Sequence, residues 1–110
     1  MLKLQVSPVF IIPNPLNFYT MPKFIIERDI PGISNFSPEQ FKDMSKKSCQ
    51  VISKMGSQIQ WLHSYVTGNK VYSIYIAPNK ELIQEHARQG GVPANVISLV
   101  TATIDPTTAE

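Results

Sequence analysis

The chain has 110 residues, of which 43% are hydrophobic and 16% charged, with a formal net charge of +2. Its length predicts one domain with a modest core, and its small, evenly spread charge argues against a nucleic-acid partner, which needs a basic stripe. The one cysteine, Cys49, excludes an internal disulfide framework and favours a reducing, cytoplasmic location.

Residues 1–20 differ in character from the rest of the chain. The apolar run 9–12 is too short to span a membrane, and prolines at positions 8, 13 and 15 interrupt it. A signal peptide would need a longer apolar centre and a small-residue cleavage site. We therefore expect no membrane association. We interpret residues 1–20 as an N-terminal extension, either disordered or the product of a misplaced start, and residues 21–110 as one domain.

The first predicted element of that domain is a strand over residues 23–28. Its side chains alternate, so Phe24 and Ile26 point to one face and Ile25 and Glu27 to the other. A proline–glycine pair then ends the strand and opens a loop.

A helix is predicted next, from the serine, proline, glutamate and glutamine of residues 37–40. The serine is a good N-cap, the proline suits the first helical position, and the glutamine completes a capping box. The helix should end at Gly56. Small residues, including Cys49, lie along its apolar stripe, which predicts that Cys49 is a buried, inert thiol.

A hairpin is predicted from two strand patterns, residues 59–67 and 70–77, which flank the turn signal Gly68–Asn69. Strict alternation places four apolar side chains of these strands under the helices: Leu62, Val66, Ile74 and Ile76. The opposite, open face would then collect aromatic and imidazole side chains: Trp61, His63, Tyr65 and Tyr75.

The second helix should begin at Asn79 as N-cap and end at Gly90, with His86 as a structural histidine beside its buried stripe. A final strand pattern covers residues 96–104. The order of elements is βαββαβ, which predicts the α+β class and a ferredoxin-like sandwich. In this fold a four-stranded antiparallel sheet carries both helices on one face.

The open face predicts self-association. An aromatic sheet face of this size is rarely left to water, and rings with polar tips suit an interface between proteins. We therefore expect a homodimer in which two sheets pack face to face as a dimeric α+β barrel, with Trp61, Tyr65 and Tyr75 at the interface or in its cavity.

Three stretches, residues 21–32, 60–66 and 85–95, carry a family resemblance; they read MPKFIIERDIPG, QWLHSYV and EHARQGGVPAN. Over about residues 21–110 the chain resembles a small bacterial family of unknown function. The best-described members of that family are ferredoxin-like dimers that bind nickel. The resemblance therefore implies a homodimer with nickel or a similar divalent metal as its cofactor.

Three residues are candidate metal ligands. His63 offers an imidazole, a common ligand for nickel, although it could equally be a hydrogen-bonded interface histidine. Glu27 and Asp29 alternate on the first strand and place two carboxylates on one face, roughly 6–7 Å apart. The alternative for this pair is a polar strand end accompanied by Arg28.

Three classes of function remain, and we rank a small dimeric metal-binding protein first. The second is a small cofactor-independent enzyme of the dimeric α+β barrel type, such as an oxygenase or isomerase, which would use His63 with Tyr65 or Tyr75. The third is a non-catalytic assembly domain. Because no catalytic motif stands out, we expect that the protein is not an enzyme.

Overall fold

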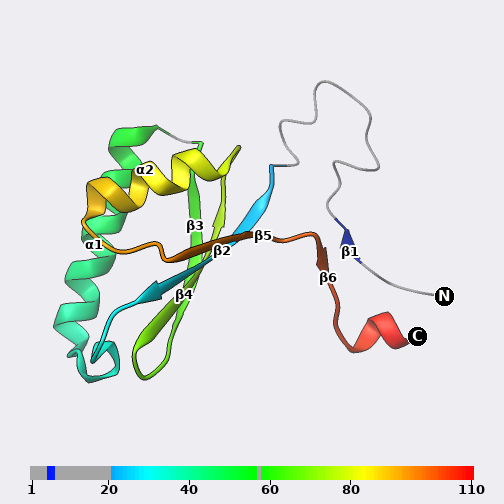
Figure 1. Ribbon diagram of the computed structural model, residues 1–110, viewed down its shortest axis with the longest axis horizontal. Helices are drawn as coiled ribbons and strands as arrows, with labels where there is room; N and C mark the ends of the chain where they lie inside the picture. The colour runs from blue at the N-terminus through cyan, green and yellow to red at the C-terminus, as the bar shows by residue number, and fades with distance from the viewer. Residues whose placement is uncertain (1–4, 7–20, 57) are drawn as a thin grey trace.

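The fold is described from a computed structural model, which defines residues 5–6, 21–56 and 58–110. Its main sheet is antiparallel with the strand order β3-β4-β2-β5, and the two long helices lie on one face of it (Figure 1). This is the predicted α+β, ferredoxin-like arrangement. The elements are β2 (Lys23–Asp29), η3 (Ile33–Asn35), α1 (Pro38–Met55), β3 (Gln60–Val66), β4 (Lys70–Ile76), α2 (Lys80–Gly90) and β5 (Val96–Leu99).

Both long helices begin at the caps that the sequence predicts. In α1 the Gln40 amide donates to the Ser37 hydroxyl at 3.2 Å, and the Ser37 amide donates to the Gln40 side chain at 2.8 Å. In α2 the Leu82 amide donates to the Asn79 side-chain oxygen at 3.0 Å. Gly91 ends α2 with a φ of 69°, a left-handed conformation that favours glycine.

The core lies between the sheet and the helices. The alternation of β2 is as predicted, with Phe24 and Ile26 buried and Ile25 on the open face. From the helices, α2 contributes Ile83, which is fully buried. Apolar side chains from the strands, their flanking residues and α2 form one cluster: Phe24, Ile26, Ile59, Tyr75, Ala77 and Ile83.

A β-bulge in β3 overturns the predicted face of Trp61. Trp61 pairs with Tyr75 and His63 pairs with Ile74, so Leu62 is an extra residue between two adjacent positions of β4. Trp61 therefore packs against the core on the helix-covered face, while His63 lies on the open face. The prediction that both residues share the open face is wrong, because the bulge interrupts the alternation on which it rested.

Tyr75 was also predicted on the open face and is only 2% exposed beneath the helices. Pairing with β2 explains the difference. Phe24 lies opposite Tyr75 and Ile26 lies opposite Ser73, so these β4 residues share the covered face with the buried side chains of β2. The isoleucines of β4 are consequently on the open face, where they are only partly buried.

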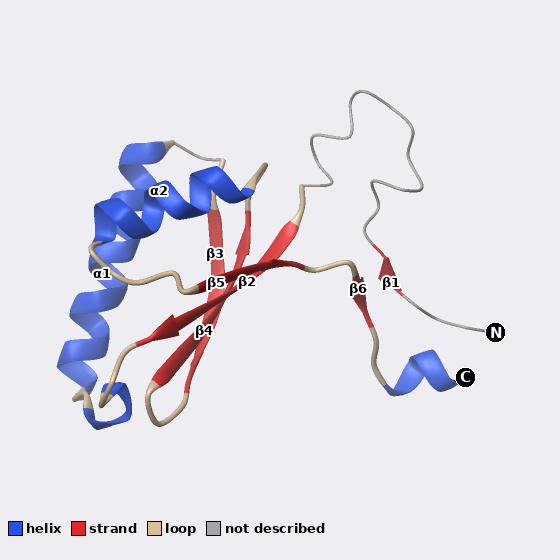
Figure 2. Cartoon of the chain, in the orientation of Figure 1, coloured by secondary structure: helices blue, strands red, loops and turns tan. Residues whose placement is uncertain are grey.

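The predicted last strand is divided in two. After β5 the chain leaves the sheet and forms β6 (Ala102–Thr103), which pairs antiparallel with β1 (Gln5–Val6), and it ends in η4 (Pro106–Ala109). Figure 2 shows β1, β6 and η4 apart from the two long helices and the main sheet. The rest of the predicted disordered extension, residues 1–4 and 7–20, lies outside the described residues. No helix within the described ranges is long and apolar enough to cross a membrane.

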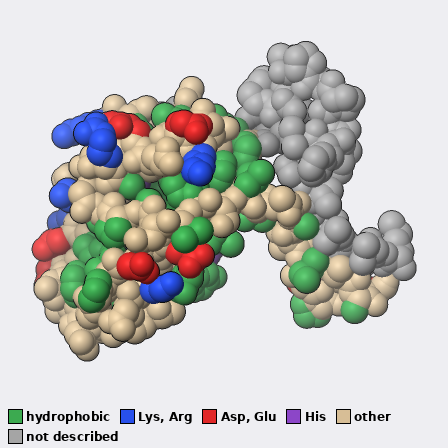
Figure 3. Space-filling view, viewed as in Figure 1, with side chains coloured by type: hydrophobic (Ala, Val, Ile, Leu, Met, Phe, Trp, Pro, Cys, Tyr) green, Lys and Arg blue, Asp and Glu red, His purple; other side chains and the backbone are tan. Residues whose placement is uncertain are grey.

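Charged side chains do not gather by sign on the face of the molecule shown in Figure 3. Lysine and arginine side chains lie among aspartates and glutamates, with hydrophobic side chains between them. On this face the charges form no basic stripe of the kind that nucleic acids need.

The core predicts a large difference between two isoleucines. Ile83→Ala should lower the free energy of unfolding by about 2–5 kcal/mol, because Ile83 is fully buried and its truncation leaves a cavity. Ile104→Ala is the matched control: Ile104 is 70% exposed, so the same change should cost less than about 0.5 kcal/mol. Urea unfolding of both variants measures the difference, and equal losses would contradict this description of the core.

Candidate functional site

The open face of the sheet carries His63 and Tyr65 side by side. Both belong to β3 and both are exposed, Tyr65 by 61%. Their ring centroids lie 5.0 Å apart, with the rings nearly perpendicular at 78°. The structure therefore brings together two of the residues that the sequence singled out, on a face that no helix covers (Figure 1).

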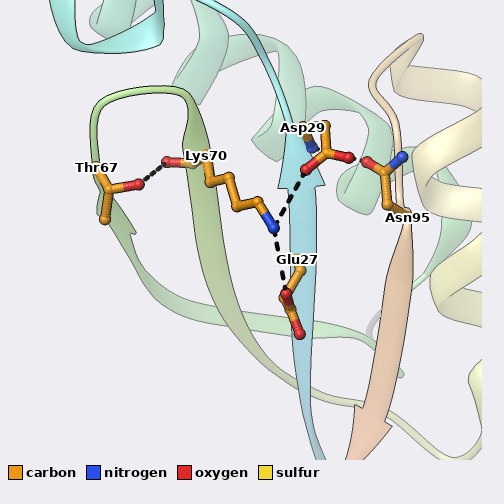
Figure 4. Close-up of polar contacts among 5 residues, drawn as sticks. All are labelled: Glu27, Asp29, Thr67, Lys70 and Asn95. Carbon is orange, nitrogen blue, oxygen red and sulfur yellow. Dashed lines mark hydrogen bonds and ion pairs between the residues drawn. The ribbon is translucent and has the colours of Figure 1, made fainter.

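Glu27 and Asp29 share this open face, but a cation lies between them. The Lys70 ammonium group is 3.8 Å from the Glu27 carboxylate and 3.6 Å from that of Asp29 (Figure 4). Asn95 also accepts a hydrogen bond from the Asp29 amide at 2.7 Å. The partner of the carboxylates is therefore Lys70 and not Arg28, whose side chain points to the opposite face.

The candidate metal ligands do not converge within one chain. His63 is on β3 and Glu27 is on β2, with β4 between them, so two strand spacings separate them by roughly 10 Å. Across the described residues, no group of three or more histidine, cysteine, aspartate or glutamate side chains is placed to hold a metal ion. A single copy of the described domain thus lacks a complete metal site.

A second candidate site lies on the other side of the sheet, and sequence reasoning missed it. A cavity of about 450 Å³ opens between the covered face of the sheet and the two helices. Apolar side chains form much of its wall. A polar cluster also lines it: Arg28, Ser48, Trp61, Ser64, Ser73, Tyr75 and His86.

Arg28 is the main charge of this cavity. Its side chain is directed inward by the alternation of β2, and the residue is only 4% exposed. The guanidinium donates to the Pro93 carbonyl at 2.8 Å, to the Tyr75 hydroxyl at 3.3 Å and to the Ser73 hydroxyl at 3.5 Å. It also lies 5.8 Å from the centre of the Tyr75 ring. Every one of these hydrogen-bond acceptors is neutral.

The bulge in β3 extends this polar cluster across the sheet. It leaves Trp61 and Ser64, three residues apart, on the same covered face, where the indole nitrogen donates to the serine hydroxyl at 2.9 Å. That hydroxyl lies 2.7 Å from the hydroxyl of Ser73, which accepts from Arg28. A continuous chain of hydrogen bonds therefore joins the β3 indole to the buried guanidinium on β2.

His86 closes the cluster from the helix side. Its Nε2 lies 3.3 Å from the hydroxyl and 3.4 Å from the carbonyl of Ser48, so it joins α2 to α1. The residue is 2% exposed, and its Nδ1 has no hydrogen-bond partner among the described residues. Burial lowers the pKa of His86, and the positive charge of Arg28 lowers it further against the opposing Ser48 hydrogen bond. The imidazole is accordingly neutral at physiological pH.

Cys49 departs from its prediction. It is exposed on α1, whereas Val51 is the buried residue of that helix. The small residues that suggested a common stripe do not all face the sheet: Ser45 and Ser48 line the cavity, and Cys49 does not.

Comparison with known proteins identifies the family. Residues 24–100 match the family described as nickel responsive protein SCO4226-like. The chain belongs to this family. The crystal structure of SCO4226 from Streptomyces coelicolor A3(2) resembles the fold with a TM-score of 0.63, covering 74% of this chain and 99% of that chain. At 14% sequence identity this likeness shows a shared fold. No curated protein matches the sequence.

Membership of the SCO4226-like family confirms the resemblance seen in the sequence. The matched residues 24–100 include both long helices and the four strands of the main sheet, apart from Lys23, the first residue of β2. They also include both candidate sites, the open face with His63 and the cavity with Arg28.

The lowered pKa of His86 predicts how stability depends on pH. A histidine in the unfolded chain has a pKa of about 6.5, whereas the pKa of His86 in the folded protein is lower. Below about pH 6.5 the unfolded state therefore binds a proton more readily than the folded state does. The free energy of unfolding should therefore fall as pH is lowered from about 7.5 to about 5.5. Chemical unfolding at a series of pH values, in buffer with a metal chelator, measures this slope.

His86→Gln should make the slope shallower, because it removes the titrating group. Ser53→Gln is the control: Ser53 is exposed and has no titratable side chain, so its replacement should leave the slope as in the wild type. A slope that is unchanged by His86→Gln would contradict the assignment of the buried neutral imidazole.

Proposed function

We propose that this chain is a nickel-binding protein that acts as a homodimer, with the metal held between the open sheet faces of two copies. The observation that carries the proposal is the position of His63, exposed on a sheet face that no helix covers. The family description, nickel responsive protein, supports the choice of metal. The free, exposed thiol of Cys49 supports a reducing, cytoplasmic location.

The composition of the open face supports the dimer. Exposed apolar side chains lie on it or at its bulge, among them Ile25 at 36%, Leu62 at 43% and Val96 at 45%, together with the Tyr65 ring. Apolar surface of this kind marks an interaction site. In a two-fold dimer the same face of each copy is buried, so one surface supplies both sides of the interface.

A dimer would also supply the ligands that one chain lacks. Two copies bring two His63 imidazoles, together with the carboxylates of Glu27 and Asp29, to one interface. Imidazole nitrogen and carboxylate oxygen are suitable ligands for a divalent transition metal. Lys70 occupies the carboxylates in the single chain, but exposed ion pairs contribute only about 0–1 kcal/mol, so a divalent cation can displace it.

The structure removes one version of the enzyme alternative. That version placed Tyr75 beside His63 in a shared barrel cavity, but Tyr75 lies on the covered face and His63 on the open one. Of the two tyrosines in the enzyme hypothesis, Tyr65 is therefore the one that lies next to His63.

Nickel binding should depend on His63 and not on His86. His63→Ala should weaken binding by more than about tenfold, because it removes a nitrogen ligand. His86→Gln should leave the affinity close to the wild-type value, because this side chain lies on the other side of the sheet. Binding by the wild type should also weaken in acidic buffer, since metal ligands must be deprotonated to bind. Isothermal titration calorimetry with nickel measures all three.

An equal loss in the two histidine variants would contradict this assignment of roles. Wild-type protein that binds no nickel at pH values above neutrality would remove the proposed metal function altogether.

The dimer should depend on the centre of the open face. Ile25→Glu should yield monomer, because packing the two faces together would desolvate the new charge against apolar side chains. Ile104→Glu, a change at an exposed isoleucine outside the main sheet, should leave the dimer intact. Sedimentation equilibrium gives the mass of each species. A monomeric wild type, or a dimeric Ile25→Glu, would place the interface elsewhere.

A further inference from the structure

The cavity beneath the helices has a chemistry that the proposed metal site does not use. We propose that it binds a small molecule with one carboxylate group on an apolar body, and that Arg28 recognises the carboxylate. This proposal needs neither the metal nor the dimer, since every residue that carries it comes from one copy of the domain.

The charge of Arg28 has no counter-ion among the groups that it contacts. Arginine is almost never fully buried unless it is paired, because an uncompensated charge is poorly solvated in the interior. Arg28 is 4% exposed, and the acceptors around it are a carbonyl and two hydroxyls. None of the described residues that line the cavity is an aspartate or a glutamate. The second cation in its wall, Lys47, makes the cavity more positive. A bound anion would supply the missing charge.

Arg28 also keeps N–H donors that its contacts do not use. A guanidinium has five N–H groups. The hydrogen bonds of Arg28 use the one on Nε and one on each terminal nitrogen. One N–H on each terminal nitrogen is then left without an acceptor among the described residues. A carboxylate accepts two N–H donors from arginine in the fork arrangement that this residue favours.

Tyr75 and His86 add polar groups to the same wall. The Tyr75 hydroxyl accepts from Arg28, so its own proton is free to donate to a ligand oxygen. His86 Nε2 lies 3.3 Å from the Ser48 hydroxyl and 3.4 Å from the Ser48 carbonyl, so both of its contacts are with one residue of α1. The buried Nδ1 has no partner within the described part of the chain. A hydroxyl on the ligand, or a water molecule that the ligand orders, can donate or accept and would supply that partner.

The remaining wall suits an apolar body. Its volume of about 450 Å³ falls within the range of about 300–1,000 Å³ of small-molecule sites. A few polar groups at one place in a mostly apolar cavity are typical of such sites. The apolar side chains come from η3, from α1, from the hairpin strands and from the segment after α2: Ile33, Phe41, Met44, Val66, Val71 and Val92.

The test compares octanoate with octanamide, which share a chain and differ in charge. Trp61 is the only tryptophan of the protein and lines the cavity, so its fluorescence reports binding. Octanoate should change this fluorescence in a saturable way, and octanamide should bind at least about tenfold more weakly, because it forms no charge-assisted hydrogen bond with Arg28. No saturable change with octanoate, or equal affinity for the two compounds, would overturn the proposal.

Two sets of variants locate the binding. Arg28→Met should abolish the preference for octanoate over octanamide, provided that circular dichroism shows it to be folded. Ser45→Phe tests the cavity with its charge intact: Ser45 lines it from α1, so the larger side chain should weaken octanoate binding at least about tenfold. Ser53→Phe is the matched control, exposed on the same helix and outside the cavity. A folded Arg28→Met that keeps the preference, or octanoate binding that is unchanged in Ser45→Phe, would overturn the assignment.

Discussion

The β-bulge in β3 decides which side chains face which side of the sheet. Because Leu62 is an extra residue, Trp61 and Ser64 point under the helices while His63 and Tyr65 point to the open face. A regular strand would place Trp61, His63 and Tyr65 on one face. The bulge thus lets one short strand contribute to two different surfaces, the open face proposed to bind metal and the cavity proposed to bind a carboxylate.

The alternation of β2 separates charge in the same way. Glu27, Arg28 and Asp29 are neighbours in sequence, yet the two carboxylates lie on the open face with Lys70, and the guanidinium lies inside without a carboxylate. If all three side chains shared a face, they would neutralise one another. Their separation leaves two carboxylates on the open face and one positive charge in the cavity, and the two binding proposals rest on this difference.

Local signals in the sequence predicted the fold, because each acts over a few residues. The capping residues Ser37 and Asn79 start their helices, and the alternation of β2 matches its burial. The predicted faces of Trp61 and Tyr75 are wrong, because the face of each residue depends on pairing with other strands. Leu62 is an apolar residue that gives no signal of the bulge in the sequence. The cavity was missed because its hydrogen bonds join Arg28 to residues 45 to 65 positions away.

Trp61 and His63, two positions apart in sequence, face opposite sides of the sheet. An aromatic NOESY spectrum of the protein in solution tests this placement most directly. We expect cross-peaks between the Trp61 indole and the β-protons of Ser64, and between the rings of His63 and Tyr65, whose centroids are 5.0 Å apart. Cross-peaks from the Trp61 indole to the rings of His63 and Tyr65, with none to Ser64, would contradict it.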